Sequence, residues 1–148
     1  MIVNFHKVNL KKKYPLQISR GTHSKSKNLF VEIIKDGIAG WGESAPGKTE
    51  GASNVDEVEN ELLKLIDTGI DSLSIYEIFQ RSKELKIPPC AHAAIDIALW
   101  DWKAKKAGLP LNNLLGLPTP STPTSLTIGI NPPEIIKERV EMHLSNPQ

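Results

Sequence analysis

The chain has 148 residues, of which 39% are apolar, and it carries 18 Lys and Arg against 17 Asp and Glu. This length is normally one domain with a real core, and the balanced charge argues against a nucleic-acid partner or a polybasic membrane surface. One cysteine, Cys90, makes no internal disulfide, and no apolar run is long enough for a signal peptide or a membrane span, so we expect a cytoplasmic protein that binds neither nucleic acid nor membrane.

The first fifty residues predict a small antiparallel sheet. Ile2–Leu10 is rich in apolar and β-branched residues and predicts a strand, which Pro15 is expected to interrupt before a second short extended piece. Leu29–Lys35 gives the strongest strand pattern. It is followed by Asp36–Gly37 and then by Ile38–Glu43, which indicates a hairpin with a type I′ turn.

Helical spacing of apolar residues replaces this pattern after residue 53. We predict four helices in turn, Asn54–Asp67, Ser74–Leu85, Cys90–Lys106 and Leu111–Leu115. Gly69 and Gly108 are expected to end the first and third of these helices. The order therefore favours a sheet followed by a helical bundle.

The last thirty residues predict one strand and one helix. Residues 118–123 contain three prolines and indicate a linker. Ser125–Ile130 is β-branched and predicts a strand, and Pro132–Pro133 opens a helix. The apolar stripe expected on this helix consists of Ile135, Ile136, Val140 and Leu144.

Six segments keep an order and spacing that is hard to obtain by chance. They are Pro15–Thr22, Asp36–Glu43, Ala93–Asp101, Gly108–Leu111, Leu114–Gly116 and Thr124–Ile130. Together they resemble the N-terminal half of the enolase superfamily, in the mandelate racemase/muconate lactonizing branch that contains the dipeptide epimerases. The resemblance implies an α+β fold: a capping domain over residues 1–117 with a three-stranded antiparallel sheet and a helical bundle, a Pro-rich linker over 118–123, and the first strand and helix of an incomplete β/α barrel over 124–148.

The resemblance also implies an isomerase reaction. In such epimerases one lysine removes the α-proton, a second lysine returns it on the other face, and Mg²⁺ held by carboxylates stabilises the enediolate. These lysines and metal ligands are expected beyond Gln148, so we name no catalytic residue and no metal ligand in the chain. Mg²⁺ and a dipeptide substrate are expected for the intact family protein, and the 148 residues alone are expected to bind no cofactor and to be inactive.

Three residues are candidates for substrate contact through the resemblance. Thr127 lies where the family has a strand threonine that touches substrate. The segment Ser19–Lys25 matches a capping-domain loop that supplies, in Ala-Glu epimerases, an arginine for a substrate carboxylate. His23 stands at that position and Arg20 lies nearer the strand, which puts a Glu-containing dipeptide in doubt. The alternative interpretations are an ordinary strand threonine and a polar surface loop.

Two further sequence patterns can be interpreted either as functional sites or as ordinary structural features. Residues 47–51, bracketed by glycines, match a second specificity loop of the family, or form a plain connection between sheet and helix. His92 and Asp96 are four residues apart and share a helix face, but two ligands without a third make a weak metal site, and we favour a structural pair.

Other functions stay open from the sequence. Muconate cycloisomerases and o-succinylbenzoate synthases share the enolate step and are the alternatives within the superfamily. A non-catalytic, stand-alone capping-domain protein is the alternative from another class. Because one strand and one helix cannot close a barrel, residues 124–148 are expected to pack on the capping domain, to swap with a second chain or to be poorly ordered, which leaves a homo-oligomer open.

Overall fold

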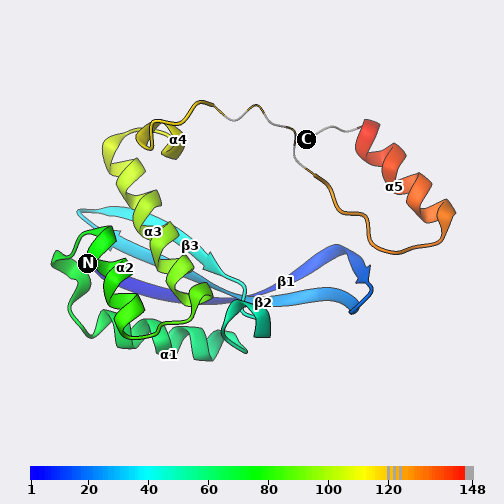
Figure 1. Cartoon of the computed structure of the whole chain (residues 1–148). Coiled ribbons are helices and arrows are strands. Elements are labelled where there is room, and N and C mark those ends of the chain that lie inside the picture. The colour runs from blue at the N-terminus through cyan, green and yellow to red at the C-terminus, as the bar shows by residue number, and fades with distance from the viewer. Residues whose placement is uncertain (120, 122, 124, 146–148) are drawn as a thin grey trace. The chain divides into compact units, whose positions relative to one another are not determined.

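The computed structural model describes residues 1–119, 121, 123 and 125–145 (Figure 1). Its elements are β1 (Ile2–Ile18), β2 (Gly21–Lys35), β3 (Ile38–Ser44), η1 (Lys48–Glu50), α1 (Val55–Ile66), η2 (Ile70–Ser72), α2 (Ile75–Glu84), α3 (Pro89–Ala107), α4 (Leu111–Leu114) and α5 (Pro133–Ser145). The described residues form two compact units. Unit 1 lies within residues 1–9 and 27–120, and unit 2 lies within residues 10–26 and 121–148.

The three strands form one sheet in the order β1-β2-β3. β2 and β3 are antiparallel, with a register that runs from Leu29 opposite Ser44 to Lys35 opposite Ile38. The two residues between them have positive φ, 54° at Asp36 and 75° at Gly37. Positive φ at both positions is the requirement of a type I′ turn, so the predicted hairpin is confirmed.

The first two strands are longer than predicted. Pro15 does not interrupt β1. This strand lies at the edge of the sheet, where a residue without a backbone N–H is tolerated. Likewise, Ser19–Lys25 is not a loop. Only Ser19 and Arg20 form the turn, and β2 begins at Gly21. The longer β1 gives the residues after the turn a partner strand, which the sequence pattern alone did not show.

The core of unit 1 lies between the sheet and three helices. Leu29, Val31 and Ile33 alternate along β2 and are fully buried, as expected for the covered face of an antiparallel sheet. They pack against apolar residues of the helices: Val55, Val58, Leu62, Leu65, Ile78, Ala91, Ala94, Ile95, Ala98 and Leu99. All five predicted helices are present, and the ends of the first four agree within one residue.

Two glycines of β3 allow α3 to lie directly on the strand (Figure 1). A Cβ atom placed at Gly40 would lie 2.2 Å from the backbone oxygen of Ala98. A Cβ atom at Gly42 would lie 1.9 Å from the backbone oxygen of Ala94. Glycine in a strand commonly marks the close approach of another backbone, and here that backbone is a helix.

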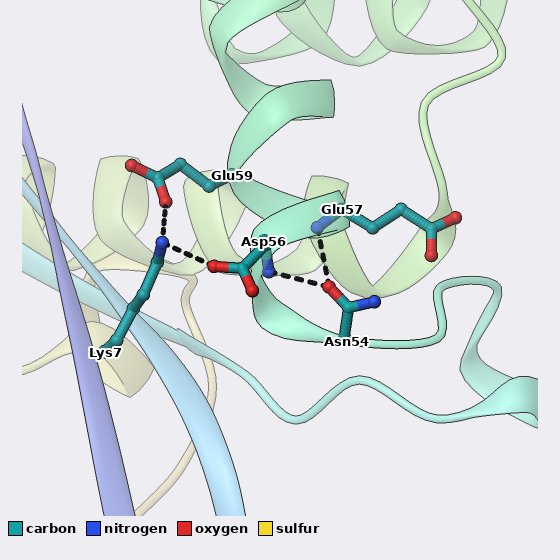
Figure 2. Close-up of polar contacts among 5 residues, drawn as sticks. All are labelled: Lys7, Asn54, Asp56, Glu57 and Glu59. Carbon is teal, nitrogen blue, oxygen red and sulfur yellow. Dashed lines mark hydrogen bonds and ion pairs between the residues drawn. The ribbon is translucent and has the colours of Figure 1, made fainter.

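Polar side chains bind the N-terminal turn of α1 (Figure 2). Asn54 Oδ1 accepts the backbone N–H groups of Asp56 at 2.9 Å and Glu57 at 3.0 Å, which have no partner within the helix. Lys7 of β1 lies 2.6 Å from carboxylate oxygens of both Asp56 and Glu59. The N-terminal strand and the first helix are therefore joined by ion pairs as well as by the core.

Unit 2 departs from the expected strand and helix in two ways. The predicted strand over Ser125–Ile130 is wrong: residues 125–130 form no regular strand, and among the described residues no barrel strand lies beside them to supply the hydrogen bonds. The expected stripe of α5 is also wrong in part, since Ile136, Val140 and Leu144 are 38%, 40% and 75% exposed. The partly buried face is instead formed by Ile135, Arg139, Met142 and His143.

The predicted α+β fold, a three-stranded antiparallel sheet followed by helices, is confirmed. The domain division at residues 117 and 124 stays a prediction. No helix in the described part of the chain is both long and apolar enough to cross a membrane.

Candidate substrate-facing site

Unit 2 contains a cavity of about 450 Å³. Its walls come from the end of the β1–β2 hairpin, from the segment before α5 and from α5 itself. The lining residues are Lys12, Lys13, Tyr14, Pro15, Leu16, Gln17, Thr22, Leu126, Thr127, Ile128, Gly129, Asn131, Arg139, Met142 and His143. A mixture of apolar walls with a few polar and charged groups is typical of small-molecule sites.

A close backbone approach holds the segment before α5 against β1. The Ile130 backbone N–H donates to the carbonyl of Gln17 at 2.8 Å. A Cβ atom at Gly129 would lie 2.8 Å from the backbone nitrogen of Gln17 and 3.2 Å from Leu16 Cδ1. Glycine at 129 therefore permits the contact that brings Thr127 and Thr22 to one cavity.

Helix α5 presents three side chains to the cavity. Arg139, Met142 and His143 are spaced by three and four residues, which places them on one helix face. The Arg139 guanidinium carbon lies 3.0 Å from the centre of the Tyr14 ring. The Tyr14 hydroxyl donates to Met142 Sδ at 3.5 Å. These contacts join α5 to β1 within unit 2.

The structure separates the three predicted contact residues. Thr127 lines the cavity, together with Thr22, which the sequence did not single out. Arg20 lies in the hairpin turn and His23 on β2, and both are exposed and outside the cavity lining. Substrate contact by Thr127, Arg20 and His23 stays a prediction.

Sequence patterns alone did not identify Arg139 or Tyr14 as site residues. The spacing of Arg139, Met142 and His143 was a usable signal, because these three polar or polarisable side chains share one face of the helix and none of them belongs to the predicted apolar stripe. Nothing in the local sequence paired this face with Tyr14, which lies 125 residues earlier.

The second candidate loop, residues 47–51, is short and closed. Lys48–Glu50 forms a single turn of 3₁₀-helix, and Gly47 and Ala52 are bridged. Gly51 has a φ of 93°, and a Cβ atom there would lie 2.8 Å from Pro89 Cδ. These features are those of a tight connection between sheet and helix, and the sequence alternative of a specificity loop stays a prediction.

His92 and Asp96 were considered above as two possible metal ligands on one face of α3. No group of three His, Cys, Asp or Glu side chains that could hold a metal ion occurs in the described ranges. His92 Nδ1 lies 3.0 Å from Ser82 Oγ, and its ring lies 5.3 Å from that of Phe79. Burial lowers the pKa of His92, and nearby Asp96 opposes this change. These contacts pack His92 against α2, and the structural interpretation of the His92–Asp96 pair stays a prediction.

The family comparison agrees with the fold. The family described as "Mandelate racemase / muconate lactonizing enzyme, N-terminal domain" matches residues 2–116. A hydrophobic dipeptide epimerase of Flavobacteria bacterium (strain MS024-2A) is 58% identical over 97% of this chain and 41% of the relative. A hydrophobic dipeptide epimerase of Roseobacter litoralis is 46% identical over 98% of this chain and 42% of the relative. The chain thus spans about two fifths of the length of these curated relatives.

Solved structures show the same similarity. The substrate-liganded L-Ala-D/L-Glu epimerase of Bacillus subtilis has a TM-score of 0.85 and 26% identity, covering 99% of this chain and 42% of that chain. The dipeptide epimerase of Enterococcus faecalis V583, complexed with Mg and the dipeptide L-Leu-L-Tyr, has a TM-score of 0.84 and 28% identity, covering 97% of this chain and 42% of that chain.

Proposed function

Because the chain belongs to the mandelate racemase/muconate lactonizing enzyme family through its N-terminal domain, we propose that it is the capping part of a dipeptide epimerase. The observation that carries the proposal is 58% identity to a hydrophobic dipeptide epimerase along 97% of the chain. The proposed reaction removes the α-proton of one residue of the dipeptide and returns it on the opposite face. The cavity of unit 2 supports a substrate-facing role for this chain.

Within this proposal the chain selects the substrate and other residues perform the chemistry. Thr127 is proposed to donate a hydrogen bond to the substrate, and Arg20 and His23, both exposed at the hairpin end, to contact its distal part. The described residues of the chain do not fit a Mg²⁺ site, because they include no cluster of three possible ligands. We derive no step through the metal. Because the relatives are more than twice as long as this chain, we propose that the two lysines and the Mg²⁺ ligands lie outside these 148 residues.

A hydrophobic dipeptide is the proposed substrate. Two relatives that match nearly the whole chain are named for hydrophobic dipeptides. By the resemblance, His23 occupies the position where Ala-Glu epimerases have an arginine, and a histidine is a poorer permanent partner for a side-chain carboxylate. An o-succinylbenzoate synthase of Geobacillus stearothermophilus is only 29% identical over 81% of the chain, so this alternative has weaker support.

A chimera tests the proposal. This chain replaces the matched 144 residues of the Flavobacteria relative, and the product is assayed with hydrophobic dipeptides and Mg²⁺ by α-proton exchange in D₂O. We expect exchange in the chimera and none above the buffer rate from the 148 residues alone. A folded chimera without activity, or turnover by the chain alone, contradicts the proposal.

Thr127→Val in the same chimera tests the contact residue. Loss of one hydrogen bond to the substrate predicts a decrease in kcat/KM of roughly ten-fold. Thr119→Val is the matched control, because Thr119 is exposed and lies before the segment that lines the cavity. Equal activity of the two variants excludes Thr127 as a contact residue.

A further inference from the structure

The walls of the unit 2 cavity have an unbalanced charge. Lys12, Lys13 and Arg139 are positively charged, and no Asp or Glu is among the lining residues. The acidic residues of α5 do not correct this: Glu141 pairs with Lys137 at 3.9 Å, and Glu134 and Glu138 are exposed and outside the cavity lining. A concave surface with charge of one sign concentrates ions of the other sign.

Of these three cations only Arg139 is partly buried, whereas Lys12 and Lys13 are exposed. The Nε atom of Arg139 is buried and has no hydrogen-bond partner among the described residues. The part of the chain that the structure describes contains no ion pair to it. A guanidinium that is partly withdrawn from water without a carboxylate partner is unfavourable, and an anionic ligand removes that cost.

The surroundings of Arg139 are suited to an anion. The ring of Tyr14 lies within 5.4 Å of a second cation, Lys13 Nζ, so two positive charges meet at one aromatic side chain. Hydrogen-bond donors come from the hydroxyls of Thr22 and Thr127, which line the same cavity. The Asn131 amide already donates to the Gly129 carbonyl at 2.8 Å and helps to fix the wall.

We propose that this cavity binds a small carboxylate-bearing ligand through Arg139, assisted by Lys12, Lys13 and the two threonine hydroxyls. The planar fork of a guanidinium matches a carboxylate. The apolar part of the ligand would contact Leu16, Leu126 and Met142, which line the same cavity. This inference does not rest on the proposed function, because it concerns binding by the chain itself and requires no turnover.

Two sources share this chemistry, a free organic acid and the terminus of a short peptide. Propionate and N-acetyl-alanyl-alanine represent them, and propionamide is the neutral probe of matched shape. Binding to the ¹⁵N-labelled full chain is followed by the amide shifts of Thr22 and Thr127. We expect both or either carboxylate to shift these amides, and the tighter one identifies the source. Equal shifts with propionamide, or no shift with any probe, overturn the proposal.

Arg139→Gln removes the guanidinium and its charge and leaves a shorter, neutral polar side chain. We expect at least a ten-fold weaker affinity for the carboxylate that binds, while Arg139→Lys retains part of it. Lys137→Gln is the matched control, because it removes one positive charge from the same helix at an exposed position outside the cavity. Wild-type affinity in Arg139→Gln, or equal losses in both glutamine variants, contradicts the role of Arg139.

A structural role of Arg139 against Tyr14 predicts a different pattern. In that case Arg139→Gln lowers the thermal stability but leaves the preference for propionate over propionamide unchanged. Tyr14→Leu separates the two effects, since it removes the aromatic contact and keeps the charge. Retained carboxylate preference in Tyr14→Leu and its loss in Arg139→Gln support the anion site. The reverse result overturns it and leaves the epimerase proposal untouched.

Discussion

Gly40 and Gly42 are constrained by the backbone of α3 rather than by a turn. A Cβ atom at either position would meet backbone atoms of Ala94 or Ala98, and at Gly40 also Trp102. Two sequence patterns underlie this contact: glycines at alternate positions of a strand, and alanines four residues apart on a helix. The sequence did not show that the two patterns face each other, because that pairing spans more than fifty residues.

Gly42→Ala tests this contact. The added methyl group would lie 1.9 Å from the Ala94 carbonyl oxygen, and a backbone atom within a helix cannot turn aside as a flexible side chain does. We expect a loss of about 1–3 kcal/mol in the free energy of unfolding, measured in urea, because overpacking of a core against rigid atoms has such costs. Ala39→Val is the control, since it adds bulk to the opposite face of the same strand. A Gly42→Ala variant as stable as the control disproves the close approach.

Lys7 shows how one exposed residue joins two elements, β1 and α1. Its hydrogen bond to Asp56, followed by that to Glu59, raises the pKa of the Lys7 ammonium. The same hydrogen bond from Lys7 lowers the pKa of the Asp56 carboxyl below 3.8. Asp56 also lies in the first turn of α1, where a negative charge is favourable near the helix N-terminus.

The directions of these two pKa changes predict the pH range in which the Lys7–Asp56 pair stabilises the fold. The contribution of Asp56 is present above pH 3.8 and is lost as the pH falls through its lower value in the folded chain. The contribution of Lys7 is present below pH 10.5 and is lost as the pH rises through its higher folded value. The ion pair therefore stabilises the fold between these limits, by a small amount because both groups are exposed.

Lys7→Gln should therefore be less stable than wild type at pH 7, with a difference that decreases at pH 2 to 3. Urea unfolding of both proteins at each pH measures it. Lys11→Gln makes the same charge change on the same strand and should show no such pH dependence. A constant difference for Lys7→Gln at every pH would show that the carboxylates are not its partners.

Elements with local sequence signals were predictable, and elements that depend on distant partners were not. The Asp36–Gly37 turn and the first turn of α1 have their partners within a few residues; the turn was predicted correctly, and the start of α1 to within one residue. The hairpin end was not, because the continuation of β1 through Pro15 depends on its position at the sheet edge. The same holds for the candidate site. Thr127 was predicted as a contact residue from the resemblance, whereas Arg139 and Tyr14 are distant in sequence and meet only in the fold.

At the scale of the whole molecule, the two units differ in how they are held. Unit 1 has a continuous apolar core between sheet and helices. Unit 2 is held by a smaller set of contacts, the Ile130–Gln17 hydrogen bond, the close approach at Gly129 and the side chains around Tyr14. Stability is therefore expected to differ between them, since local opening is easiest where few apolar groups are buried.

Amide hydrogen exchange on the whole chain, confirmed as a monomer, measures this difference. The β2–β3 ladder should exchange slowest, because its amides are hydrogen-bonded beside the core. Among the described amides of residues 125–130, only that of Ile130 donates to a backbone carbonyl, so 125–129 should exchange fast and Ile130 more slowly. Gly129→Ala should remove the protection at Ile130 by pushing the segment from Gln17, while β3 is unchanged. Protection of 125–129 equal to that of β3 in the monomer would mean that these residues pair as a regular strand, contrary to the structure.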